Sequence, residues 1–399
     1  MPAASQHSVV TEVPGPLSKA ALRKLDDFFD SRPVHFVVDY DKSEANYIVD
    51  VDGNKFLDVG LNRIFTAQSG SEANELAFKA AMMLYRRKER GEGIDWTDEE
   101  ISSCLDNAKP GSPDLAVLSF TNSFHGRGFG SLSTTRLKAV HKLDIPSFNW
   151  PKAPFPALKY PLEQFMHENS CLDEVERLIR SWHCPVVALI IEPIQSEGGD
   201  NHASPSFFQR LRDLTKRHGV IMIADEVQTG FGATGKFWGH EHWNLASPPD
   251  IVTFSKKAQT AGYYFGDRML VPDKAYRQFN TWIGDPAHVI MGKAIIQEIL
   301  SKNLVEQCSR VGDILYAELE KLSRKYPKYV KNLRGKGQGT YIAFDTIDSA
   351  AFVKAMKMKA ISIGTCGVNT VRLRPMLIFE EQHVPLLISA LEEVLAGLH

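Results

Sequence analysis

Residues that could do chemistry follow directly after three short apolar segments of this 399-residue chain. The segments and the residues that follow them are Val186–Ile191 with Glu192 and Glu197, Val220–Ala224 with Asp225, and Ile251–Phe254 with Lys256. Short apolar runs of this kind predict buried strands, and ligands of open α/β sheets bind beyond the carboxyl ends of the strands. Any one of these residues would fit a solvated strand end, but the three strands together favour a site that contains carboxylates and a lysine.

Catalysis with pyridoxal phosphate is the chemistry that needs a lysine and a carboxylate in this arrangement. The lysine amine forms a Schiff base with the aldehyde of the cofactor, and the carboxylate keeps the pyridine nitrogen protonated so that the ring accepts electrons. Asp225 would stay ionised beside that nitrogen because it gains a cationic partner. Burial near cationic groups would lower the pKa of Lys256, which must lose its proton to act as nucleophile and base.

A phosphate group needs donors, and Ser69-Gly70-Ser71 offers them because it leads directly into a long predicted helix. Gly70 lets the main chain approach an anion closely, and the helix N-terminus supplies free N–H groups. Such a turn is also a common helix cap, so it indicates a phosphate site only together with Lys256 and Asp225.

Apolar runs alternate with amphipathic helices from about residue 63 onward, which predicts an α/β fold with a mostly parallel central sheet. One well-marked helix begins at Ser204-Pro205, an N-cap followed by proline at the first helical position. We expect a large domain over 60–290 and a smaller α+β C-terminal domain over 291–399. The N-terminal segment 1–59 is expected to form part of the smaller domain.

The overall composition narrows the possible classes of partner and compartment. The formal net charge is −2, from 46 basic and 48 acidic residues, which favours neither nucleic acid nor a membrane as partner. The five cysteines are scattered without a CxxC pair, which is typical of reduced thiols. No apolar run approaches the ~20 residues of a membrane helix. The first residues resemble neither a signal peptide nor a transit peptide, so we expect a cytoplasmic protein, with the mitochondrial matrix as the alternative.

Five segments together resemble the class III aminotransferases, which share fold type I of the pyridoxal-phosphate enzymes: SGSEANE, SFHGR, EPIQSEGG, DEVQTGFGATGKFW and TFSKK. The most specific feature is DEVQTG with a lysine, Lys256, 31 residues after Asp225. Within that class, FHGRGFGSLSTTRLKAVHKLDIPSFNWP, KFWGHEHWNL and YRQFNTWIGDP resemble the 4-aminobutyrate aminotransferases, above all those of the fungal type. The resemblance extends from about Lys19 to the C-terminus.

This resemblance implies a set of cofactor contacts. Lys256 would form the Schiff base, with its neighbour Lys257 as the rival, and Asp225 would pair with the pyridine nitrogen. The other implied contacts are Val227 and Phe124 on the two ring faces, Gln228 on the phenolic oxygen, Gly70 and Ser71 on the phosphate, and Thr281 on the phosphate of a partner subunit. A homodimer with shared sites is therefore expected. Phe124 would also fit an ordinary core aromatic.

The resemblance also implies which residues select the substrate. Arg127 and Lys138 match a cationic pair that holds the carboxylate of 4-aminobutyrate, although either alone would fit a surface charge. Glu197 and Arg372 match a switching pair. Glu197 neutralises Arg372 while 4-aminobutyrate is bound, and Arg372 is released to bind the α-carboxylate of glutamate or 2-oxoglutarate. The implied products are succinate semialdehyde and glutamate. The alternatives are another ω-aminotransferase, acting on β-alanine or ornithine, and an inactive homologue.

The chain departs from the family pattern in two places. Animal members hold an iron–sulfur cluster through cysteines near the phosphate turn, where this chain has Ser69 and Glu72, so we expect no metal. Family members also continue after the hairpin predicted at Tyr47–Val59 with a further strand and helices. Here Val59 is followed within a few residues by Ile64-Phe65-Thr66. We expect an internal deletion after Val59 that removes a wall of the substrate pocket and part of the dimer contact.

Overall fold

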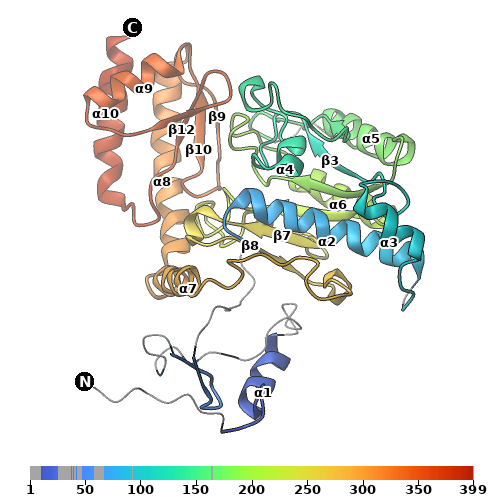
Figure 1. The fold of residues 1–399 in the computed structure, drawn as a ribbon. Coiled ribbons are helices and arrows are strands. Elements are labelled where there is room, and N and C mark those ends of the chain that lie inside the picture. Colours follow the sequence, from blue (N-terminus) through green and yellow to red (C-terminus); the bar gives the residue numbers. More distant parts are fainter. Residues whose placement is uncertain are drawn as a thin grey trace.

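A six-stranded sheet forms the centre of the larger domain in the computed structural model (Figure 1). In spatial order its strands are β4 (Lys152–Ala153), β3 (Ala116–Phe120), β5 (Val186–Ile191), β6 (Ile221–Asp225), β7 (Ile251–Phe254) and β8 (Gly262–Phe265). The first five strands run parallel, and β8 pairs antiparallel with β7. The predicted mostly parallel sheet is therefore confirmed, and the three strands predicted ahead of Glu192, Asp225 and Lys256 lie within one residue of the observed bounds of β5, β6 and β7.

The structure describes residues 10–25, 37, 39, 42, 47–57, 67–91, 93–162 and 165–398. In the N-terminal segment, β1 (Tyr47–Val49) and β2 (Lys55–Leu57) pair antiparallel, as the predicted hairpin requires. The Asp52 carboxylate in their turn accepts the Leu17 and Ser18 N–H groups at the start of α1 (Pro16–Leu25). Val59 and the predicted strand Ile64–Thr66 lie outside the described residues. The placement of 1–59 with the smaller domain stays a prediction.

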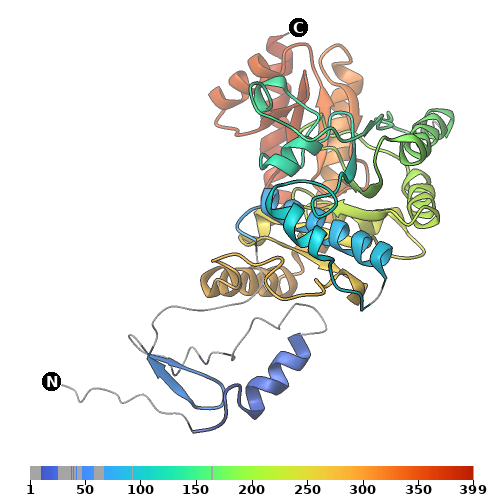
Figure 2. The same ribbon diagram turned by 45° about the vertical axis from the view of Figure 1, so that its right-hand side comes forward.

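Helices cover both faces of the central sheet (Figures 1 and 2). The long helix α2 (Gly70–Arg90) crosses β5 to β8 on one face, while α5 (Phe165–Ser181) and α6 (Pro205–Arg217) pack together on the other. The start of α6 is the predicted one, because the Ser204 hydroxyl accepts the Phe207 N–H at 3.1 Å. The remaining helices of this domain are α3 (Asp98–Leu105), α4 (Phe129–Thr134) and the 3-10 helices η1 (Ala139–His141), η2 (Gly239–Trp243), η3 (Lys256–Ala258) and η4 (Arg268–Leu270).

The smaller domain contains a four-stranded antiparallel sheet with helices on one side of it (Figure 1). Its elements are β11 (Gly364–Cys366), β12 (Thr370–Leu373), β10 (Ile342–Asp345) and β9 (Lys331–Arg334) in spatial order, with α8 (Leu304–Lys325), α9 (Ser349–Met358), η5 (Glu381–His383) and α10 (Val384–Gly397). A preceding helix, α7 (Pro286–Ser301), packs through Ile299 with Phe254 of the larger domain. The second hydrophobic core includes Val311 on α8. The exact boundary between 290 and 291 stays a prediction.

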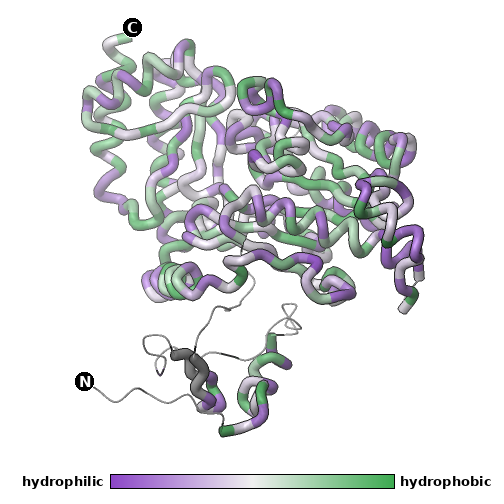
Figure 3. Tube along the Cα trace, in the orientation of Figure 1, coloured by the Kyte–Doolittle hydropathy of each residue, from purple (hydrophilic) through white to green (hydrophobic). Residues whose placement is uncertain are grey.

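The core of the larger domain lies between the sheet and its helices, where hydrophobic residues run along the strands (Figure 3). Phe207 on α6 is fully buried and meets Phe120, Phe155 and Phe208 edge to face, with ring centroids 6.5, 6.1 and 5.4 Å away. Edge-to-face aromatic contacts add to the free energy of burial. This cluster holds α6 against the sheet.

Phe207→Ala is therefore expected to lower the free energy of unfolding by about 3–5 kcal/mol, because it removes buried surface and leaves a cavity. Urea denaturation followed by circular dichroism measures the change. Leu105→Ala is the control, since Leu105 is 80% exposed, and it should cost less than about 0.5 kcal/mol. Equal losses in the two variants would contradict this account of the core.

Candidate active site

Lys256 and the carboxyl ends of β5 and β6 meet at one edge of the central sheet. Lys256 begins η3 just after β7, in a left-handed main-chain conformation with φ +51°. Burial lowers the pKa of this lysine below its ordinary value, while the nearby carboxylates of Glu197 and Asp225 act in the opposite direction. Arg372 adds to the lowering. The structure thus brings Lys256 together with three other predicted site residues.

The Asp225 carboxylate is buried and held from several sides. Its Oδ2 atom lies 2.9 Å from the Asn74 amide nitrogen and 2.8 Å from His125 Nδ1, and its Oδ1 atom accepts the Val227 N–H at 3.0 Å. The Thr253 hydroxyl donates to the Asn74 carbonyl oxygen at 2.7 Å, which orients the amide. Buried hydrogen-bond networks of this kind hold one side-chain geometry. Asp225 therefore has a fixed orientation at the end of β6.

The N-terminus of α2 lies against the turn that follows β6. A Cβ atom at Gly70 would come within 2.6 Å of a Val227 methyl carbon, so only glycine allows this approach. The Ser71 hydroxyl accepts the Arg127 N–H at 3.1 Å, and a Cβ atom at Gly126 would lie 2.4 Å from the same hydroxyl oxygen. The predicted phosphate turn, the FHGR segment and Val227 are therefore neighbours.

Ser69 and Glu72 cap α2. The Ser69 hydroxyl accepts the Glu72 N–H at 3.3 Å, and the Glu72 carboxylate accepts the Gln68 N–H at 2.6 Å. The first bond satisfies an N–H group in the first turn of the helix, and the second holds the residue before the N-cap. Oxygen atoms with this function are poor ligands for an iron–sulfur cluster, which requires thiolates. The absence of a metal stays a prediction.

Glu197, Arg372 and Gln228 form a contact between the two domains. Glu197 Oε1 accepts from Arg372 Nη1 at 2.8 Å and from the Gln228 amide at 3.0 Å. Burial alone would raise the pKa of Glu197, but the hydrogen bond and charge of Arg372, with Gln228, bring it below the ordinary value. The structure thus joins the predicted switching pair. The Gln228 amide, predicted to reach the cofactor, faces Glu197 here, and both roles stay predictions.

Arg127 and His141 lie beside the Phe124 ring. The Arg127 guanidinium lies 5.0 Å from the centre of the Phe124 ring, and the His141 ring lies 5.6 Å from it. Burial lowers the pKa of His141, Arg127 and Lys138 lower it further, and Glu197 acts in the opposite direction. Lys138 and Arg127 are exposed. His141 therefore senses the charges of the predicted carboxylate-binding pair and of Glu197.

Sequence reasoning missed three of these neighbours: His141, His125 and Asn74. His141 lies three residues after Lys138, and His125 follows Phe124 directly, so their closeness to predicted residues was the available signal. Asn74 carried no signal beyond its place in the first turns of α2. Thr281 lies exposed ahead of α7, and within the described part of the chain no hydrogen bond or ion pair joins it to the others. Its predicted role concerns a partner subunit.

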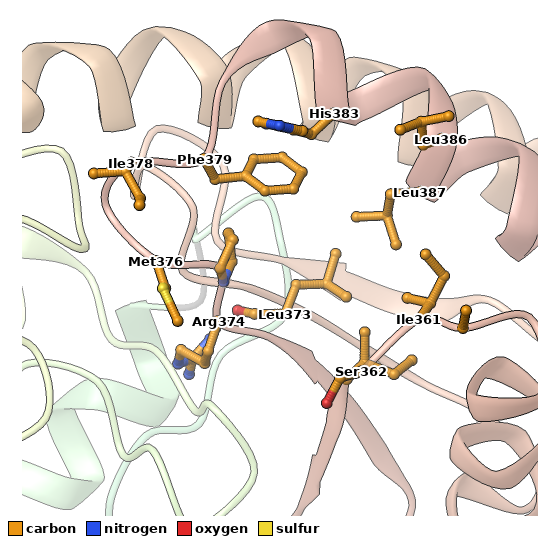
Figure 4. A pocket seen from close by; sticks show the side chains of 13 residues that line it. Ile361, Ser362, Leu373, Arg374, Met376, Ile378, Phe379, His383, Leu386 and Leu387 are labelled. Carbon is orange, nitrogen blue, oxygen red and sulfur yellow. Dashed lines mark hydrogen bonds between the residues drawn. The ribbon is translucent and has the colours of Figure 1, made fainter.

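A separate apolar pocket lies inside the smaller domain (Figure 4). It has a volume of about 430 Å³, and its lining includes Ile361, Leu373, Ile378 and Leu387. Arg374 lies at one end of it, beside Met376 (Figure 4). The lining contains none of the predicted site residues, so this pocket is distinct from the candidate active site.

Comparisons with known proteins agree with this geometry. The family described as "Aminotransferase class-III" matches residues 59–395. Solved structures with the same fold include a lysine aminotransferase from Mycobacterium tuberculosis, with a TM-score of 0.72, 24% identity and coverage of 96% of this chain and all of that one. A Bacillus anthracis aminotransferase has a TM-score of 0.69 at 21% identity, over 96% of this chain and 99% of that one. The chain belongs to the class III aminotransferase family, as its motifs predicted.

Its relatives within that family are more specific. The 4-aminobutyrate aminotransferase of Emericella nidulans is 50% identical, over 98% of this chain and 91% of the relative. The Saccharomyces cerevisiae 4-aminobutyrate aminotransferase is 46% identical, over 96% of this chain and 95% of the relative. The mitochondrial 4-aminobutyrate aminotransferase of Sus scrofa is 39% identical, over 97% of this chain and 90% of the relative. The first alignment runs over 453 positions, more than the 399 residues of this chain. Positions of the relative are therefore absent here, in agreement with an internal deletion, whose place after Val59 stays a prediction.

The segment after Glu197 contains a buried histidine whose titration affects stability. His202 is 3% exposed, and burial, with the charges of Arg334 and Arg374, lowers its pKa to about 3. A histidine has its ordinary value of 6.5 when unfolded. Because the folded chain binds the proton less readily, its stability is present above about pH 6.5 and is lost as the pH falls toward about 3.

His202→Gln is expected to reduce this acid sensitivity. Between about pH 7.5 and about pH 5 the unaltered chain should lose about 2 kcal/mol more unfolding free energy than the variant. Urea midpoints at the two pH values measure the difference. An identical loss in both proteins would show that His202 does not titrate in this way.

Proposed function

We propose that the chain is a pyridoxal-phosphate-dependent transaminase that transfers the amino group of 4-aminobutyrate to 2-oxoglutarate, giving succinate semialdehyde and glutamate. The contact between Glu197 and Arg372, close to Lys256, is the observation that carries this proposal. A carboxylate that neutralises an arginine lets one pocket take a substrate that lacks an α-carboxylate. The same arginine, once released, binds a substrate that has one. The relatives named 4-aminobutyrate aminotransferase support the assignment.

The donor set fits the cofactor. The Asp225 carboxylate, fixed by Asn74 and His125, would face the pyridine nitrogen. The free N–H groups at the start of α2, next to Gly70, would hold the phosphate, since helix N-termini favour anions. Val227 and Phe124 would lie on the two faces of the ring. When bound, pyridoxal phosphate supplies the electron sink that stabilises a carbanion at the carbon bearing the amino group.

Lys256 is the residue that moves the proton. Its pKa is lowered, chiefly by burial, so the neutral amine that a nucleophile or base requires forms more readily than in water. Its position among Glu197, Asp225 and Arg372 places this amine at the edge of the sheet where the substrate binds. Lys256 is therefore the proposed catalytic base.

Arg127 and Lys138 bind the carboxylate at the far end of 4-aminobutyrate. Arg127 supplies a planar guanidinium, which suits two parallel hydrogen bonds, and Lys138 adds a second charge. Burial, followed by the charges of Arg127 and Lys138, lowers the pKa of His141, which favours a polar ring without further charge. During the return reaction Glu197 leaves Arg372, which then takes the α-carboxylate of 2-oxoglutarate or glutamate.

The proposed assembly is a homodimer in which Thr281 completes the phosphate site of the partner subunit. No helix in the described part of the chain is long and apolar enough to cross a membrane. We place the enzyme in the cytoplasm, with the mitochondrial matrix as the alternative because a mitochondrial form occurs among the relatives.

Borohydride reduction of the protein loaded with pyridoxal phosphate should fix the cofactor on Lys256. Peptide mapping by mass spectrometry identifies the labelled residue, and Lys256→Ala should remove the label. A label on Lys257 would refute the lysine assignment. A protein that takes up no cofactor under these conditions would favour the inactive homologue.

Arg127→Ala should lower kcat/KM for 4-aminobutyrate by a factor that corresponds to about 2–5 kcal/mol, because the substrate carboxylate loses its main partner. An amine of similar length without a carboxylate should lose much less. Steady-state rates with both substrates provide the measurement. Arg324→Ala is the control, since the Arg324 side chain on α8 is 79% exposed, and equal losses for the two substrates would mean that Arg127 is structural.

A further inference from the structure

Lys257 has no function in the proposed chemistry, although it follows Lys256 directly. The left-handed main chain at Lys256, φ +51°, gives the two side chains different neighbours. Lys256 lies among the carboxylates of the candidate site. Lys257 Nζ instead donates a hydrogen bond to the main-chain oxygen of Gln228. The residue is half-buried, and its ammonium end is enclosed by protein atoms.

The carbonyl of Gln228 belongs to the turn after β6, where neighbouring polar groups are also fixed. The Glu226 carboxylate accepts the N–H groups of Gly239 at 3.0 Å and His240 at 2.6 Å. Lys257 adds a hydrogen bond to the Gln228 carbonyl of this turn. Hydrogen bonds from a charged donor are stronger than those between neutral groups. Lys257 therefore helps to fix the main chain at Gln228.

The side chain of Gln228 leads from this turn to the switching pair. Its amide donates to Glu197 Oε1 at 3.0 Å, the same oxygen that accepts from Arg372 at 2.8 Å. A carboxylate oxygen has room for two donors, so the two contacts support each other. With the Gln228 amide in place, Glu197 is oriented toward Arg372. Two hydrogen bonds thus connect Lys257 with the group that decides which substrate binds.

We propose that Lys257 is a positioning residue that, through Gln228, holds Glu197 on Arg372 and so sets the preference of the enzyme for 4-aminobutyrate over glutamate. Without the Lys257 contact the Gln228 amide moves, and Glu197 rotates away from Arg372 more readily. Arg372 is then open to an α-carboxylate more of the time. The preference shifts toward glutamate. This inference rests on the proposed function and deepens it.

The charges around Lys257 add a dependence on pH. Arg374 after β12, Lys256 on η3, Glu226 after β6 and Cys308 on α8 face its ammonium group. Burial, followed by the charges of Arg374 and Lys256, lowers the pKa of Lys257 to about 8. Below that pH the ammonium donates a charge-assisted hydrogen bond, and above it the neutral amine donates a weaker one. The preference for 4-aminobutyrate should therefore weaken as the pH rises through about 8.

Lys257→Met tests the proposal, because methionine is a flexible chain of similar length without a donor. The full chain loaded with pyridoxal phosphate is mixed with 4-aminobutyrate or with L-glutamate under single-turnover conditions. For each substrate the maximal rate constant is divided by the half-saturating concentration. The ratio of the two values should fall about tenfold in Lys257→Met, as expected from one lost charge-assisted hydrogen bond. Lys257→Arg should restore the ratio, because it keeps a charged donor. Lys354→Met, exposed on α9, is the matched control.

If the values for both substrates fall equally in Lys257→Met, or if neither changes, the ratio stays the same. That outcome would overturn the proposal while leaving the proposed function intact. Borohydride labelling of Lys257 in the unaltered chain would overturn the proposed lysine assignment and the inference with it. If Lys257→Met does not fold, the test is the ratio of the values for 4-aminobutyrate and L-glutamate in the unaltered chain, measured from about pH 7 to about pH 9. A ratio that does not fall over that range overturns the proposal, and a fall that Lys257→Arg removes supports it.

Discussion

The buried guanidinium of Arg334 joins the smaller domain to the segment that carries Glu197. Arg334 is 3% exposed and donates to the Gly199 carbonyl at 3.0 and 2.6 Å and to the Asp345 carboxylate at 2.8 Å. A buried cation that loses such partners costs about 3–5 kcal/mol. The position of Glu197 relative to Arg372 therefore depends on this contact, and the candidate site exists only where the two domains meet in this way.

The larger domain supplies the other half of the site through a different physical constraint. Parallel strands bring their carboxyl ends to one edge, and the main-chain groups inside the sheet are satisfied by neighbouring strands. Polar side chains are left at the strand ends, where Asp225 is held by Asn74 from α2 and His125 from the loop after β3. Because α2 also lies against Val227, its N-terminus reaches the same edge. The phosphate turn and the aspartate are thus placed by one packing arrangement.

Charge balance explains why this edge tolerates so many ionisable groups. Glu192 is fully enclosed, and burial, with the charge of Asp225, raises its pKa well above the ordinary value. Glu197 keeps its charge because Arg372 contacts it. Each buried group is either paired or shifted toward its neutral form, as the cost of an isolated buried charge requires. Lys256 is shifted in the same direction, toward the neutral amine, and this is the form that the proposed chemistry needs.

The sequence alone was sufficient for the fold class, the bounds of the central strands and the family, because periodicity and spacing are local properties of the chain. Asp225 and Lys256 could be named because each lies at the carboxyl end of a buried strand. The partners of Asp225 could not, since Asn74 and His125 lie 151 and 100 residues away and meet it only through packing. The different environments of Lys256 and Lys257 were equally hidden. Spacing favoured Lys256 as the Schiff-base lysine, but the separate neighbours of the two side chains follow from the left-handed turn at Lys256 and the position of the Gln228 carbonyl.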